Sequence, residues 1–396
     1  MKKQKHATSS PAELGKLLRI LGTKKQRERT PLAWYRTERG LAVRLTPGGG
    51  VVIIAGEPGT VEAAARGEIT TSRASFAGRT DAITGAGADV VHAYQAADAY
   101  EAGEARPEEQ HGAPIESYRL PVEMIEALGW CADAAATDEA RLLLQSVAVQ
   151  LIPGGLRLVA GDNYRIHLAG TSEGYEKAEP VQELHLPRRV AAYLASRGEP
   201  VRVDFHYHRA TMEAPGFFAS WSDTGAKWPD FRSVIPAKDD QTGAVRVSPE
   251  SLAGAVESVA DRAAVELAIA GKSRESVQLV ALATGARSFE IGAGAARATV
   301  AAAGEGAGAA TIDRRYLAEA LAGMNKRNTC AVHFAGEVRP VVFRDVAGRV
   351  AVVMPVRVPA EGSELVRDLE SKARMQDAIE KATGTEPAAE IEPAHA

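Results

Sequence analysis

The most informative stretch of the sequence is LRLVAGDNYRIH, residues 156–167. Its apolar residues, and the turn Pro153-Gly154-Gly155 just before it, predict strand structure. Asp162-Asn163 is compatible with a tight turn, because Asn tolerates a positive backbone angle φ. Two further stretches follow, WPDFRSVIP at residues 228–236 and AVVMPVRV at residues 351–358. Strands joined by short turns are therefore expected over the C-terminal two thirds of the chain.

Helix openings recur at domain-sized intervals. Pro11, Pro121 and Pro249 each stand at about the first helical position, with an acidic residue in the first turn. These prolines are 110 and 128 residues apart, which is longer than a short structural repeat of roughly 20 to 50 residues. A second helix is predicted to open near Arg188 and near Arg314, and strands are expected after each helix. The sequence thus predicts α+β architecture in three repeated domains and a tail: residues 1–115, 116–237, 238–358 and 359–396.

Composition excludes several classes of protein. The chain has 396 residues, 45% hydrophobic and 25% charged, which is typical of folded globular domains. No apolar run approaches the roughly 18 to 20 residues of a membrane span, and the N-terminus has no secretory signal core. We therefore expect a cytoplasmic protein. Cys131 and Cys330 lack the paired spacing of a disulfide framework or zinc site, so both are expected to be buried thiols.

Charge leaves the question of nucleic-acid binding open. The net charge of −4 excludes the strongly basic composition of a tight, static nucleic-acid binder. Basic side chains nevertheless cluster on or beside the predicted helices, where they form either solvated helix faces or a DNA-facing surface. The candidates are Lys16, Arg19, Lys24, Lys25, Arg188, Arg189, Arg197, Arg314, Arg315, Lys326 and Arg327.

Signs of catalysis are few. His206 and His208 alternate on one predicted strand, so both lie on one face and are compatible with metal ligation. A solvent-facing strand explains the same pattern, and no third ligand stands at a motif spacing. Gly271-Lys272-Ser273 resembles the end of a phosphate-binding loop, but Glu266 stands where that motif needs Gly. No catalytic residue, metal or cofactor is assigned, and a metal-dependent hydrolase is kept only as a remote alternative.

The three stretches quoted above resemble segments of the bacterial DNA sliding clamp, the beta subunit of DNA polymerase III, in a diverged form of phage or plasmid type. The first is similar to the turn that follows a strand in the family's middle domain, the second to its interdomain linker and the third to its C-terminal strand. The resemblance implies a head-to-tail homodimeric ring with helices lining the hole and sheets outside. It also implies a non-enzymatic processivity factor that encircles duplex DNA without sequence preference. Its partners would be DNA polymerase, other replication and repair proteins and a clamp loader.

The resemblance further implies a pocket that binds short peptides of partner proteins. Leu144, Ile166, Val234 and Val352 would supply an apolar floor, and Met354 a side chain that adapts to different peptides. Arg165 and Arg357 would orient a peptide through its carbonyl groups or an acidic side chain. The matching residues are Leu144, Gly161, Asn163, Tyr164, Arg165, Ile166, Pro229, Val234, Val352, Met354, Pro355, Val356, Arg357 and Val358.

The sequence departs from the family pattern in three respects. Gly161 replaces a usual Thr, which is expected to widen the pocket. A tail follows Val358, in which Ser363 is expected to cap a helix that runs to about Lys381 before a mobile end. We expect residues 363–396 to lie near the peptide site and to regulate access to it. Residues 1–115 carry no diagnostic motif. An alternative therefore stays open, a diverged clamp-like protein that binds partners without encircling DNA.

Overall fold

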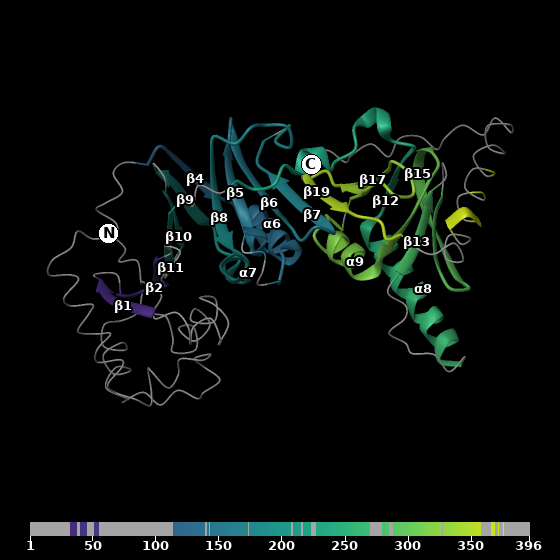
Figure 1. Ribbon diagram of the computed structural model, residues 1–396, viewed down its shortest axis with the longest axis horizontal. Coiled ribbons are helices and arrows are strands. Elements are labelled where there is room, and N and C mark those ends of the chain that lie inside the picture. The colour runs from purple at the N-terminus through teal and green to yellow at the C-terminus, as the bar shows by residue number, and fades with distance from the viewer. Residues whose placement is uncertain are drawn as a thin grey trace. The chain divides into compact units, whose positions relative to one another are not determined.

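In its computed structural model the chain divides into two compact units, Met1–Leu158 with Ala178–Trp228, and Val159–Lys177 with Pro229–Ala396. Figure 1 shows its elements. The structure describes the strands at 32–37, 40–45 and 51–54, residues 366–368, 371 and 375, and residues 114–357 apart from 139–140, 142, 173, 207–208, 215–216, 223–226, 270–278, 285–287 and 327.

The first unit contains a seven-stranded antiparallel sheet (Figure 1). Its strand order is β1 (Leu32–Thr37), β2 (Gly40–Leu45), β3 (Val51–Ile54), β11 (Phe217–Ser222), β10 (Arg209–Ala214), β9 (Val201–His206) and β4 (Glu116–Leu120). Strands β1 and β2 form an antiparallel pair in which Thr37 lies opposite Gly40.

The same unit holds a second layer of strands and two helices. These are α6 (Val122–Ala134), η2 (Leu143–Gln145), β5 (Ser146–Ile152), the first part of β6 (Gly155–Gly161), β8 (Gln182–Pro187) and α7 (Arg188–Arg197). Every residue of β5 is buried, because both helices pack against this strand. The helices predicted to begin near Pro121 and Arg188 are confirmed.

A carboxylate network holds the end of this unit in place. Glu183 on β8 accepts hydrogen bonds from Gln150 on β5, from His185 Nε2 at 2.5 Å and from the Trp228 backbone N–H at 2.6 Å. Arg157, which is fully buried, donates in turn to Gln150 Oε1 at 2.5 Å. Burial alone would raise the pKa of Glu183, but these donors outweigh it and hold the pKa below its usual value.

The second unit contains nine strands and two main helices (Figure 1). Their order is β16 (Gly308–Asp313), β13 (Leu279–Thr284), β14 (Ser288–Ala293), β15 (Ala296–Gly306), β12 (Gly243–Val247), β17 (Cys330–Phe334), β18 (Val341–Arg344), β19 (Arg349–Val353) and β7 (Arg165–Gly170). The helix α8 (Pro249–Ile269) packs on β14 and β15, and α9 (Arg314–Ala322) on β16 and β19. Two short turns, η3 (Phe231–Ser233) and η4 (Lys238–Asp240), precede β12. The helices predicted near Pro249 and Arg314 are confirmed.

Strand β15 is a feature that the sequence pattern did not predict. Its residues are mostly Ala and Gly, which are poor strand formers. Pairing with β14 on one side and β12 on the other supplies the stability that the side chains lack. Gly304 is required there, since a Cβ atom would lie 2.1 Å from the Ala244 carbonyl oxygen.

The segment after β19 packs against β13 and β16 of the same unit at Val366. Val366 is helical, is only 1% exposed and packs in one cluster with Ala281, Ala283 and Ala309. Small side chains on β13 and β16 leave room for this valine. The prediction of a helix after Ser363 is thus confirmed for Val366–Asp368.

Two further expectations concern the cysteines and membranes. Cys131 and Cys330 are buried free thiols, as predicted, and burial raises the pKa of Cys330 to about 12. Of the helices in the described residues, none combines the length and apolarity needed to span a membrane.

Candidate functional site

The turn between β6 and β7 is closed by its own backbone and by Asp162. The Asp162 carboxylate accepts hydrogen bonds from the backbone N–H groups of Tyr164 at 3.0 Å and Arg165 at 3.2 Å. Asn163 has φ of 80°, so the prediction of a positive angle there is confirmed. The turn holds Tyr164 outward with 56% of its surface exposed.

Gly161 has a backbone role in this turn. The Asp162 N–H donates to the Arg165 carbonyl oxygen at 3.2 Å, and a Cβ atom at Gly161 would lie 2.6 Å from the same oxygen. The missing side chain therefore permits the close approach of the two strands. A wider pocket at Gly161 stays a prediction.

Two tyrosines form an aromatic surface beside the turn. The ring of Tyr164 stacks on that of Tyr316, which lies on α9. Their centroids are 5.9 Å apart, with an angle of 16° between the ring planes. The guanidinium carbon of Arg165 lies 4.6 Å from the centre of the Tyr316 ring, and that of Arg315 lies 4.8 Å from it. We call Tyr164 and Tyr316 the tyrosine shelf.

Arg165 is a buried structural cation. It is 6% exposed, its Nε lies 3.3 Å from Asp162 Oδ2, and its Nη1 forms an ion pair with Glu319 on α9. Two carboxylates thus compensate its charge and join the turn to α9. The positive charge of Arg165 is therefore paired with carboxylates of the chain itself. Orientation of a peptide by Arg165 stays a prediction.

The segment after β19 runs past the tyrosine shelf. The backbone N–H of Met354 donates to the Tyr164 carbonyl oxygen, and that of Val356 to the Thr311 carbonyl oxygen, both at 2.8 Å. Met354 and Pro355 are half-buried, while Val356 and Arg357 are exposed. These bonds hold the segment beside the turn and β16. We call Tyr164, Tyr316 and residues 354–357 the candidate peptide site.

The remaining predicted pocket residues lie in different surroundings. Ile166 is half-buried and pairs with Val352, which is fully buried in β19. Pro229 is exposed and Val234 half-buried around η3, and Leu144 is half-buried in η2 of the first unit. Val358 lies outside the described residues.

Several predicted DNA-facing arginines are engaged within the chain. Arg188 Nε donates to the Ala132 carbonyl oxygen at 2.8 Å. Arg197 pairs with Glu199 at 2.7 Å, and Arg314 lies 3.5 Å from Glu257. Lys16, Arg19, Lys24, Lys25 and Arg327 lie outside the described residues. Helices α6 to α9 together carry eight acidic and six basic side chains, so their combined charge is not positive.

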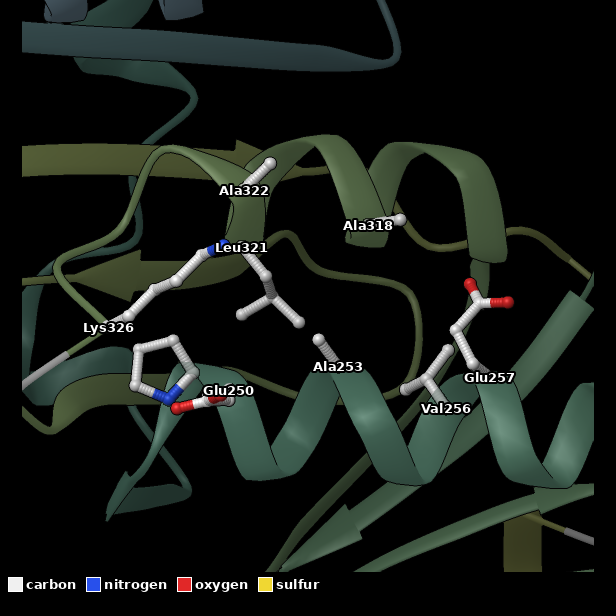
Figure 2. Close-up of a pocket in the computed structure, with 9 residues that line it drawn as sticks. Glu250, Ala253, Val256, Glu257, Ala318, Leu321, Ala322 and Lys326 are labelled. Carbon is white, nitrogen blue, oxygen red and sulfur yellow. The ribbon is translucent and has the colours of Figure 1, made fainter.

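A small groove separates α8 from α9 (Figure 2). Figure 2 shows Ala253 and Val256 of α8 facing Leu321 of α9, with Glu257 and Lys326 near its ends. Its volume of about 210 Å³ is below the roughly 300 to 1,000 Å³ of ligand pockets. The lining is formed by Pro249, Glu250, Ala253, Val256, Glu257, Ala318, Leu321, Ala322 and Lys326.

The histidine pair is only partly described. His206 ends β9 and is buried, and its carbonyl oxygen accepts a hydrogen bond from Gln182 at 2.8 Å. His208 lies outside the described residues. In the part of the chain that is described, no three His, Cys, Asp or Glu side chains are grouped so as to hold a metal ion.

Comparison with known proteins gives one clear likeness. No protein-family model and no curated protein matches this sequence. The DNA polymerase sliding clamp from Bacillus subtilis is a structural neighbour with 18% identity and a TM-score of 0.51, over 66% of this chain and 68% of that chain. The DNA polymerase III subunit beta from Borrelia burgdorferi has 14% identity and a TM-score of 0.51, over 66% of this chain and 69% of that chain. The sliding clamp from Bartonella birtlesii, bound to griselimycin, has 20% identity and a TM-score of 0.50, over 65% of this chain and 69% of that chain.

The chain has the sliding-clamp fold. The predicted α+β clamp architecture and the resemblance to the polymerase III beta subunit are thus confirmed at the level of fold. Tyr316 is a candidate site residue that the sequence pattern did not predict. Tyr164 lies 152 residues away from it in sequence, and only the packing of the folded chain brings the two rings together.

Proposed function

We propose that this chain is a DNA sliding clamp. In this proposal it is a non-enzymatic processivity factor that pairs head to tail, encircles duplex DNA and tethers DNA polymerase and other replication and repair proteins. A clamp loader would open the ring. The observation that carries the proposal is that the backbone of Met354 is hydrogen-bonded to Tyr164, whose exposed ring stacks on Tyr316, on a chain with the sliding-clamp fold.

Retention on DNA would be topological in this proposal. A closed ring needs only weak, sequence-independent attraction to phosphates, because tight contacts would slow its movement. The mixed charge of α6 to α9, with eight acidic and six basic side chains, is compatible with such loose contact. It equally suits the alternative, a clamp-like protein that binds partners without encircling DNA.

Partner binding would depend on apolar burial. An extended peptide would place apolar or aromatic side chains against the tyrosine shelf and Met354, where each buried side chain contributes about 1.5–3 kcal/mol of transfer free energy. Met354 is well suited to varied partners, since its unbranched thioether fits surfaces of different shape. The backbone bond from Met354 to Tyr164 would keep the two sides of the site together during binding.

The test is fluorescence polarisation of a labelled Gln-Leu-x-Leu-Phe-type peptide. Met354→Asp should weaken binding by roughly tenfold or more, because a carboxylate would be desolvated beneath the peptide. The control is Val338→Asp, since Val338 is 58% exposed and lies between β17 and β18, outside the candidate peptide site and the tail; it should bind like the parent. Failure of the folded parent to bind, or equal affinity of parent and Met354→Asp, would contradict the proposal.

A further inference from the structure

We propose that Arg315 makes this site selective for peptides that carry a carboxylate next to their apolar anchor residues. The proposal rests on the peptide-binding function above and adds the chemical class of peptide that the site prefers. Arg315 was predicted from sequence as a DNA-facing residue. Its position against the tyrosine shelf assigns it instead to the peptide site.

Arg315 is held at the rim of the shelf. Its guanidinium carbon lies 4.8 Å from the centre of the Tyr316 ring, a distance at which the ring attracts a cation. Its backbone N–H donates to Asp313 Oδ1 at 2.8 Å, where α9 begins. The charge is therefore both exposed and restrained in position.

The carboxylates around the shelf already have partners. Asp162 accepts two backbone N–H groups and contacts Arg165, and Glu319 pairs with the same arginine. Asp313 accepts the first-turn N–H of Arg315 itself. Among the described residues, no carboxylate forms an ion pair with the Arg315 guanidinium, in contrast to the doubly compensated Arg165. The uncompensated charge beside the apolar surface is thus a cation.

A peptide carboxylate complements this arrangement. An apolar side chain packed on Tyr316 would bring the neighbouring peptide residue close to Arg315, whose planar guanidinium can bind a carboxylate through two parallel hydrogen bonds. Because Arg315 is exposed, the preference should be modest, roughly three- to tenfold in Kd. The pair should also weaken with added salt.

The experiment compares two labelled peptides of equal shape, Gln-Leu-Asp-Leu-Phe and Gln-Leu-Asn-Leu-Phe. The full-length parent should bind the Asp peptide roughly three- to tenfold more tightly, and Arg315→Gln should remove that preference while still binding the Asn peptide. Arg314→Gln is the matched control, because it removes the same charge from the preceding residue, which faces Glu257 instead. Arg315→Glu should reverse the preference toward Gln-Leu-Lys-Leu-Phe.

The contrary outcomes are distinct. Equal binding of both peptides by the parent, or loss of the preference in Arg314→Gln as well, would overturn the role of Arg315 alone. An intact preference in Arg315→Gln together with weaker binding to a duplex DNA would show that the arginine serves phosphate contact, and would overturn it too. Failure of the folded parent to bind any of the peptides would overturn the proposed function and this proposal together.

Discussion

At the scale of single residues, Asn163 occupies a backbone conformation that most side chains avoid. Its φ of 80° is free of strain for Gly, tolerated by Asn and unfavourable for residues with a plain Cβ. We expect Asn163→Ala to lower the free energy of unfolding by about 1 kcal/mol, and Asn163→Gly to change it by less than about half of that. Urea unfolding followed by circular dichroism measures both. An alanine variant at least as stable as the parent would contradict the assigned conformation.

The turn at Asn163 could be predicted from residue types alone, whereas the contacts around it could not. Asp162-Asn163 predicted a turn because both residue types favour turns by local chemistry, and this needs no knowledge of the rest of the fold. The pairing of Arg165 with Glu319 and the stacking of Tyr164 on Tyr316 could not be predicted in this way. Each joins residues about 150 positions apart, so only the packing of α9 against β19 brings them together.

At the scale of elements, the Glu183 network links β5 and β8 to Trp228, the last residue of the first unit. Because the folded-state pKa of Glu183 is lowered, its contribution to stability is present above the unfolded-state value near 4.5 and is lost as pH falls through the folded value. Glu183→Gln should cost about 1–3 kcal/mol at pH 7, and this difference from the parent should shrink between about pH 5.5 and pH 3.

Chemical unfolding at a series of pH values tests the network. Glu213→Gln serves as the control, since Glu213 is an exposed carboxylate on β10. It should show little loss of stability at any pH in this range. A Glu183→Gln deficit that stays constant as the pH falls would mean that the carboxylate charge is not what stabilises the network.

The C-terminal segment gives the second prediction at this scale. Val366→Asp places a charge among Ala281, Ala283 and Ala309, so the helix there should detach. Burial of a valine contributes about 1.5–3 kcal/mol, and local opening governs cleavage. Trypsin should therefore cut after Arg367 roughly tenfold or more faster in the variant. Val346→Asp, at an exposed valine, should leave the rate unchanged; equal rates in all three proteins would exclude docking by Val366.

Helices were more predictable than strands for a physical reason. Proline and acidic residues at a helix start act within one turn, so Pro121 and Pro249 marked α6 and α8 correctly. Strand β15 gains its stability from partners on both sides, and its own Ala-rich sequence carries no signal. Regulation of the peptide site by residues 363–396 stays a prediction. Val366 packs against Ala309 of β16, and the Thr311 carbonyl oxygen of the same strand accepts a hydrogen bond from the Val356 backbone N–H.

At the scale of the whole molecule, the proposal of a ring requires two chains to pair. Val265 and Ile269 stand four residues apart near the end of α8, on one side of the helix, and are 51% and 83% exposed. Exposed aliphatic residues grouped in this way are typical of surfaces covered by a partner. We expect a second copy of this chain to cover them.

Light scattering at micromolar concentration measures the assembly. The parent should give about twice the chain mass of 41.8 kDa, and Ile269→Glu should give a mass near that of one chain, because a buried unpaired carboxylate opposes association. Val338→Glu, at another exposed valine, should remain dimeric. A parent mass near 41.8 kDa would favour the clamp-like protein that does not encircle DNA.

The path of the chain has a consequence for work with fragments. The segment Val159–Lys177 belongs to the second unit although the first unit resumes after it, and its strand β7 pairs with β19 along Val350–Val353. A polypeptide begun at the predicted boundary, residue 238, would lack β7 and present β19 as an open, aliphatic edge prone to self-association. Loss of peptide binding in such a fragment would reflect a missing strand, and the separate contribution of the last domain is better measured by substitution within the intact chain.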